Sequence, residues 1–150
     1  MNSISSYFAQ QNAGKRCVSI DMDHAKGRAL VLQLAEHCDV LIENFRPGVM
    51  DRLGLGYDHV VARNPRIVYV SISGFGQTGP LSGVPAHDVA TEAMGGIVSL
   101  NLGNDGQPAM PPVPIADLTA SLLALSGILM ALLRRRLLLW HAEALAPPTV

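Results

Sequence analysis

The sequence has few charged residues, few aromatic residues and no surplus of basic charge. Charged side chains make up 15% of the 150 residues, aromatic side chains 5%, and the net charge is −1. Nucleic acids and anionic membrane surfaces are bound through clustered basic side chains, so we expect neither as a partner. Hydrophobic residues reach 49%. This share is high for a domain of this length and predicts surface that contacts a partner chain or further parts of the same chain.

Several common motifs are missing as well. The two cysteines, Cys17 and Cys38, form no CxxC pair, so we expect reduced thiols in an intracellular, cytoplasmic protein. The five histidines show no HxH or HExxH spacing, and we therefore expect no metal. GxSxG, P-loop and GxGxxG motifs are absent, and the polar beginning of the chain does not resemble a secretory signal.

One apolar segment has to be weighed as a membrane span. Residues 118–133 form an uncharged run of sixteen residues that ends at three arginines. As a helix this run would be about 24 Å long, which is shorter than the ~30 Å of a hydrocarbon core. It also contains Thr119, Ser121, Ser126 and Gly127. We expect a buried core helix or an interface helix here, and no membrane contact.

What the sequence does contain is an alternation of apolar runs and helical patterns. Strands are predicted at residues 17–20, 40–42 and 67–72. Helices are predicted at residues 24–37, 57–63 and 87–94, followed by a long one that begins at Asp117 and passes Trp140. Strands separated by helices indicate βαβ units, so we expect a parallel sheet with right-handed connections.

The first of these helices is specified in more detail. Asp23 is the predicted N-cap of the helix at 24–37. Its core face would carry Leu30, Val31, Leu34 and Cys38. The residues before position 15 and the proline-rich residues 147–150 are expected to be irregular.

Two loops follow strands and would meet at one edge of the sheet. Residues 43–48 follow the strand at 40–42, and the glycine-rich residues 73–84 follow the strand at 67–72. Open α/β sheets bind ligands at the carboxyl ends of their strands. Arg46 and Arg52 lie on the first of these turns and its short helix, which suits a phosphate or a carboxylate. An ordinary connection with solvated arginines explains the same residues.

Two titratable residues are candidates for chemistry. Asp117 stands at the start of the long apolar helix, where it is either an N-cap or a carboxylate that acts as nucleophile or acid/base in an apolar setting. His87 is followed by Asp88, but neighbours in sequence do not share a helix face, so the two form no dyad by spacing.

The strings Ile42-Glu43-Asn44-Phe45-Arg46-Pro47-Gly48 and Asp51-Arg52-Leu53-Gly54 resemble the signature of the class III CoA-transferases. This family includes formyl-CoA and carnitine CoA-transferases and the alpha-methylacyl-CoA racemases. The resemblance runs from about residue 7 to residue 136. Further agreement lies in the following strings: Gly14-Lys15-Arg16, Ile20-Asp21, Asn64-Pro65-Arg66-Ile67, residues 71–80, and Asp117 with residues 127–133.

The resemblance implies an α/β fold with a Rossmann-like parallel sheet and flanking helices. This would be part of a fold whose chains interlock in a homodimer. Coenzyme A or acyl-CoA would lie along the strand ends, with Ile20 near the adenine, Asn44 and Phe45 along the nucleotide and pantetheine, and Arg52 on phosphate.

The resemblance also implies two alternative reactions. In the transferases, an aspartate matching Asp117 attacks the acyl-CoA thioester, and CoA passes through an aspartyl-CoA intermediate to a carboxylic acid acceptor. In the racemases, the matching aspartate exchanges the α-proton of a 2-methylacyl-CoA together with a histidine at the position of His87. Many transferases carry tyrosine there, although histidine also occurs among them.

The sequence departs from the family at both ends. An initial strand–helix unit is absent, a frequent lysine is replaced by Asp23, and agreement stops after Arg136. We therefore expect a truncated fragment, with an irregular segment at 1–14, part of the CoA-binding domain at 15–136 and a divergent tail at 137–150. Such a fragment could be a non-catalytic remnant that binds CoA weakly or only packs against a partner chain.

Overall fold

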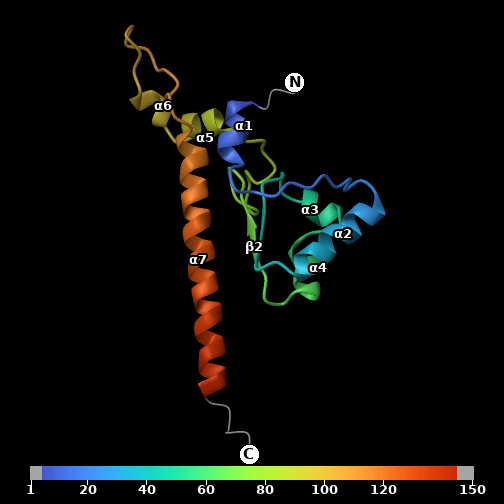
Figure 1. Cartoon of the computed structure of the whole chain (residues 1–150). Coiled ribbons are helices and arrows are strands. Elements are labelled where there is room, and N and C mark those ends of the chain that lie inside the picture. Colours follow the sequence, from blue (N-terminus) through green and yellow to red (C-terminus); the bar gives the residue numbers. More distant parts are fainter. Residues whose placement is uncertain (1–4, 145–150) are drawn as a thin grey trace, which may run out of the picture.

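A computed structural model describes the backbone of residues 5–144 and the side chains of residues 5–138 (Figure 1). Two short strands form a sheet, with helices on both of its faces. The strands are β1 (Val40–Glu43) and β2 (Val68–Ser71). The helices are α1 (Ser6–Gln11), α2 (Ala25–Glu36), α3 (Val49–Arg52), α4 (Tyr57–Arg63), α5 (Asp88–Met94), α6 (Ile97–Leu100) and α7 (Ile115–Ala144).

The two strands are parallel, as the sequence predicts. Val40 pairs with Val68, and the register continues to Glu43 opposite Ser71. Helices α2 and α4 lie on one side of the sheet and the long helix α7 lies on the other, beside β2 (Figure 1). The architecture is therefore the expected α/β arrangement with flanking helices.

The hydrophobic core lies between the sheet and the pair α2 and α4. Ala35 from α2, Val60 from α4 and Ile67 just before β2 are buried, and Val60 is completely so. Leu32, Leu41 and Tyr69 pack against these three. Burial of such side chains is the main stabilising term for this half of the molecule. This packing holds both strands in place and thereby positions the loops that follow them.

Two expectations for the first 23 residues are wrong. Residues 17–20 form no strand, and the backbone of residues 16–23 makes no hydrogen bond to other backbone groups within the described chain. A strand exists only where a neighbour satisfies its N–H and C=O groups, and no described strand lies beside this segment. The segment 1–14 is not irregular throughout either, because Ser6–Gln11 form α1. Residues 1–4 lie outside the described part.

Helix α2 forms where predicted, but its cap and its face differ. His24 is the N-cap, and its Nδ1 accepts the N–H of Lys26 at 3.2 Å. Asp23 cannot serve as the cap because it lies one residue too early. The buried contacts come from Leu32 and Ala35, whereas Leu30, Leu34 and Cys38 of the predicted stripe are exposed. Packing against α4 therefore buries a different face of α2 from the one that the spacing of apolar residues predicted.

Helix α7 is far more exposed than a core helix. Among its described side chains only Ile128 is buried, and leucines at 122, 123, 125 and 129 are more than half exposed. The expectation of a buried core helix is therefore wrong for this chain. Over Ile115–Leu138, α7 is long and apolar enough to cross a membrane by length and composition. One such helix is weak evidence for a span, and the absence of membrane contact stays a prediction. The tail predicted at 147–150 lies outside the described residues.

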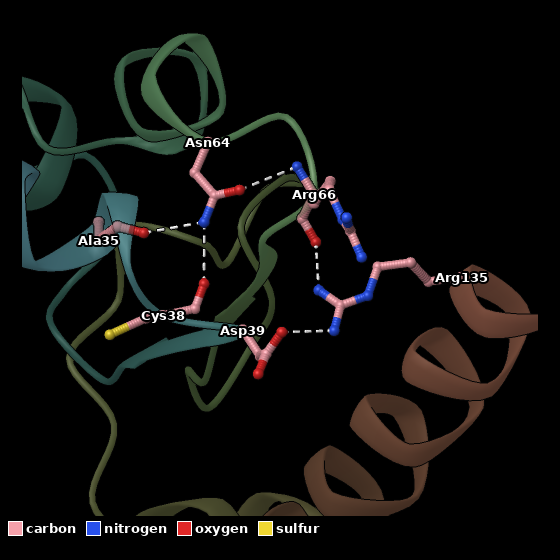
Figure 2. Close-up of polar contacts among 6 residues, drawn as sticks. All are labelled: Ala35, Cys38, Asp39, Asn64, Arg66 and Arg135. Atoms are coloured by element: carbon pink, nitrogen blue, oxygen red, sulfur yellow. Dashed lines mark hydrogen bonds and ion pairs between the residues drawn. The ribbon is translucent and has the colours of Figure 1, made fainter. Parts of the chain in front are cut away.

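A cluster of polar contacts lies at the amino ends of both strands (Figure 2). The side-chain amide of Asn64 donates to the carbonyls of Ala35 at 2.9 Å and Cys38 at 2.8 Å, while its Oδ1 accepts the Arg66 N–H at 3.1 Å. Arg135 of α7 donates to the Arg66 carbonyl at 2.7 Å and pairs with Asp39 at 2.5 Å. These contacts tie α2, both strand starts and α7 together.

Candidate functional site

The opposite edge of the sheet, where both strands end, collects most of the predicted site residues. Glu43 ends β1 and Ser71 ends β2, so the loops after both strands leave the sheet on the same side. Gly48 has a φ of 80°, a conformation that side chains other than glycine rarely adopt, and it lets the chain turn into α3. The two strands can run in the same direction because the segment between them, which contains α3 and α4, crosses back to the starting edge of the sheet.

An inner cavity of about 200 Å³ brings Asn44, His87 and Asp117 together. Asn44 follows β1, His87 precedes α5, and Asp117 lies in the first turn of α7. Residues 72–74 after β2 form the remaining wall together with small side chains of α5 and α7. Three predicted site residues that are up to 73 positions apart in the sequence thus line one space.

An outer cavity of about 560 Å³ brings Ile20, Phe45 and Arg52 together. A smaller cavity of about 70 Å³ shares Asn44 with the inner cavity and Phe45 with the outer one. The three spaces therefore follow one another along the strand ends, from Ile20 to Asp117. Asp21 and Asp23 also line the outer cavity, so Arg52 shares it with two acidic residues. They oppose any anion that Arg52 attracts.

Asp117 is not the N-cap that one interpretation of the sequence proposed. Helix α7 begins at Ile115, which makes Asp117 its third residue. Its side chain is exposed, and within the described residues its carboxylate accepts no hydrogen bond. The carboxylate is therefore available to a ligand in the cavity.

His87 occupies the N-cap position of α5 with extended backbone, and its carbonyl accepts the Thr91 N–H at 3.0 Å. Its ring is exposed and makes no hydrogen bond to Asp117 among the described contacts. His87 and Asp117 thus face a common cavity without being paired.

Three carboxylates near the site have contacts that the sequence analysis did not predict. Glu43 is nearly buried, and its Oε2 accepts the Phe45 N–H at 2.8 Å, which fixes the turn after β1. Asp88 and Glu92 on α5 bond to backbone N–H groups in the first turn of α7. The spacing of Asp88 and Glu92, four residues apart, was the available signal, because it puts both on one face of a helix.

A fourth cavity beside the site, of about 200 Å³, contains Arg46, Glu43 and Tyr69. Burial, followed by the charges of Glu43 and Asp51, raises the pKa of Tyr69 from 10.0 to about 12. Its hydroxyl donates to the Leu55 carbonyl at 3.3 Å. Arg46 lies in this separate cavity as well as in the small connecting one. Among the residues with described side chains, no three His, Cys, Asp or Glu residues are grouped so that they could hold a metal ion.

Comparison with known proteins gives consistent similarities. The chain is 39% identical to an acyl-CoA transferase of Fusarium pseudograminearum, over 88% of this chain and 29% of that protein. It is 42% identical to an acetyl-CoA:oxalate CoA-transferase of Acetobacter aceti, over 86% of this chain and 33% of that protein. A crystal structure of a CaiB/BaiF family protein from Brucella suis superposes with a TM-score of 0.79 at 39% identity, covering 83% of this chain and 33% of that one.

The chain spans about a third of the length of the curated relatives it matches. The sequence model of CoA-transferase family III matches residues 1–137. That range includes every residue on which the resemblance rests. The chain belongs to CoA-transferase family III.

Proposed function

We propose that the carboxyl-end edge of the sheet binds an acyl-CoA and that Asp117 receives its acyl group. The observation that carries this proposal is the succession of cavities from Ile20 and Arg52, past Phe45 and Asn44, to Asp117. A nucleotide at the outer end and a thioester at the inner end would match the chemistry of the lining, because Arg52 supplies positive charge and Asp117 a free carboxylate.

The proposed reaction proceeds through covalent intermediates on Asp117. Its carboxylate attacks the thioester carbonyl, which forms an acyl-aspartyl anhydride and releases CoA as a thiolate. The thiolate then attacks the aspartyl carbonyl, giving aspartyl-CoA and the free donor acid. An acceptor carboxylate attacks this thioester, again expelling CoA thiolate, and the thiolate finally takes the acceptor's acyl group and regenerates Asp117.

The acceptor is proposed to be a carboxylic acid, as in the name of the Acetobacter relative. A homodimer and a cytoplasmic location are proposed for the working protein. The exposed apolar surface of α7 supports an association of some kind, because so many exposed leucines on one helix are unusual for a monomer.

The nucleophile can be tested by chemical capture. The purified chain is incubated with acetyl-CoA or succinyl-CoA, then with hydroxylamine, which converts an anhydride or thioester of Asp117 into a hydroxamate. Peptide mass spectrometry should find this product on Asp117 only when the acyl-CoA is present. Asp117→Asn should yield none, whereas Asp58→Asn, on an exposed position of α4, should behave as the parent. A hydroxamate that persists in Asp117→Asn would refute the assignment.

A racemase is the second candidate, because His87 and Asp117 line the same cavity. It would exchange the α-proton of a 2-methylacyl-CoA in deuterated water without an acceptor acid, and His87→Ala would stop the exchange. Covalent capture on Asp117 together with no exchange would favour the transferase.

A further inference from the structure

The first turn of α7 begins directly after a proline. The Pro114 carbonyl accepts the Leu118 N–H at 3.0 Å, which is the first bond of the helix, so Pro114 occupies the N-cap position. A proline side chain has no oxygen that could accept the N–H groups a helix leaves free at its start. The amides of Ile115, Ala116 and Asp117 therefore depend on acceptors from elsewhere.

Helix α5 supplies two such acceptors. Glu92 Oε1 accepts the Ile115 N–H at 2.7 Å, and Asp88 Oδ1 accepts the Asp117 N–H at 2.9 Å. Glu92 is only 1% exposed. A buried carboxylate is costly unless it is hydrogen-bonded, so the contact with Ile115 specifies where α7 begins relative to α5. Two negative groups at this end also complement the helix dipole.

In this arrangement the carboxylate of Asp117 does not make the capping hydrogen bond that is usual at its position in a helix. An acidic residue at the third helical position commonly reaches back to the N–H of the N-cap residue. Here the N-cap is Pro114, which has no N–H, and the amides of Ile115 and Asp117 are already taken by α5. The amide of Ala116 remains, and within the described residues the Asp117 carboxylate does not bond to it. Hydrogen bonds to a carboxylate stabilise the anion and make it a weaker nucleophile. An Asp117 that caps nothing keeps its lone pairs for a ligand.

We propose that Glu92 is a positioning residue, which takes over the capping of α7 and thereby keeps the Asp117 carboxylate free in the cavity. Glu92 does not line the inner cavity, so it acts through the backbone of Ile115. The inference rests on the proposed role of Asp117, but its test needs no acyl-CoA. Failure of acyl capture and failure of this inference can therefore be told apart.

The first measurement uses the unaltered chain. Amide hydrogen exchange, followed by NMR, should show the Ile115 N–H protected, although first-turn amides of a helix ordinarily exchange rapidly. Exchange of Ile115 as fast as that of Ala116, whose N–H has no partner within the described part of the chain, would overturn the proposal.

The second measurement compares Glu92→Leu with the matched variant Glu92→Gln. Leucine removes the acceptor, and glutamine keeps a carbonyl oxygen at the same place. In Glu92→Leu we expect Ile115 to exchange about fivefold to tenfold faster, in line with the loss of a cap. The carboxylate of Asp117 should then turn toward the freed amide.

The accessibility of the Asp117 carboxylate can be measured by carbodiimide labelling with glycine ethyl ester. Labelling of Asp117 should slow by about fivefold in Glu92→Leu, as a new hydrogen bond of roughly 1 kcal/mol implies. Glu92→Gln should restore the parent rate, and the exposed Asp58 serves as internal reference in every sample. Unchanged labelling of Asp117 while Ile115 loses protection would show that Glu92 has a purely structural role. If the leucine variant does not fold, the exchange of Ile115 in the parent chain still decides the proposal.

Discussion

The two edges of the sheet use their polar groups in opposite ways. At the amino-end edge, Asn64 makes three hydrogen bonds and Arg135 makes two, all to groups of the same chain. At the carboxyl-end edge, the side chains of Asn44 and Asp117 make none within the described residues, although they line a cavity. Polar groups that are satisfied internally hold a fold together, whereas groups left free are available to a ligand. Substitutions should therefore separate stability from binding.

The largest effect is expected from Asn64→Ala at the amino-end edge. It removes three hydrogen bonds and leaves the Cys38 carbonyl and the Arg66 N–H without their partner, whereas the Ala35 carbonyl keeps the Cys38 N–H at 3.3 Å (Figure 2). We expect the free energy of unfolding to fall by about 2–3 kcal/mol, at roughly 1 kcal/mol for each bond. Urea titration measures this free energy of unfolding. Asn104→Ala, on an exposed loop position, should change it by less than about 0.5 kcal/mol. Equal losses in both variants would contradict the role of the cluster.

The next effect concerns binding at the other edge. Arg52→Ala should weaken binding of CoA about tenfold, because a charge-assisted contact to phosphate is lost, while the free energy of unfolding stays nearly constant. Calorimetry with free CoA measures the affinity. Arg63→Ala is the matched control, since Arg63 pairs with Glu36 on α2 and lines none of the three successive cavities.

The role of charge in the outer cavity can also be tested by adding a positive charge instead of removing one. Asp23→Lys replaces one of the two acidic residues that line the outer cavity with Arg52 and should strengthen CoA binding several-fold, by about 1 kcal/mol. Weaker binding in this variant would mean that the phosphates of CoA do not lie in the outer cavity.

A smaller effect is expected from Arg135→Ala. Its partner Asp39 is largely exposed, so the ion pair is screened, and the loss should be about 1 kcal/mol of unfolding free energy. Arg134→Ala, at the neighbouring exposed position, should cost less than about 0.5 kcal/mol. CoA affinity should not change in either variant, and a drop with Arg135→Ala would connect the two edges.

The smallest effect depends on pH. The pKa of Tyr69 is raised in the folded chain from 10.0 to about 12, so folding favours the neutral phenol. This contribution to stability is complete below pH 10 and is lost as the pH rises toward 12. Unfolding followed by urea at several alkaline pH values should show a decline that is weaker in Tyr69→Phe. An identical decline in both proteins would exclude Tyr69 as its source.

The predictable parts of the fold are those in which local pattern and packing agree. The β-branched run at 67–72 and the apolar run at 40–42 became β2 and β1, and the helix predicted at 57–63 is α4. Residues 17–20 have the same kind of pattern, yet no described strand lies beside them. Pattern alone cannot supply a hydrogen-bonding neighbour.

The candidate site was predictable only in part, for a similar reason. Asp117, His87 and Arg52 were candidates from the sequence pattern itself, and Ile20, Asn44 and Phe45 came from the family resemblance. The structure adds that these residues line successive cavities. The spacing of Asp88 and Glu92 puts both on one face of α5, but it does not indicate that this face meets the first turn of α7, because that is a tertiary contact. The exposure of Asp117 and of the leucines of α7 was missed because apolar composition was taken to mean burial.

The most direct test of the account is to map CoA binding on the chain by NMR. Saturating CoA should shift the amide signals of Ile20, Phe45 and Arg52 at the carboxyl-end edge. The signals of Asn64 and Arg66 at the opposite edge should stay in place. Shifts confined to the amino-end edge, or none at a concentration where calorimetry detects binding, would contradict the proposed site.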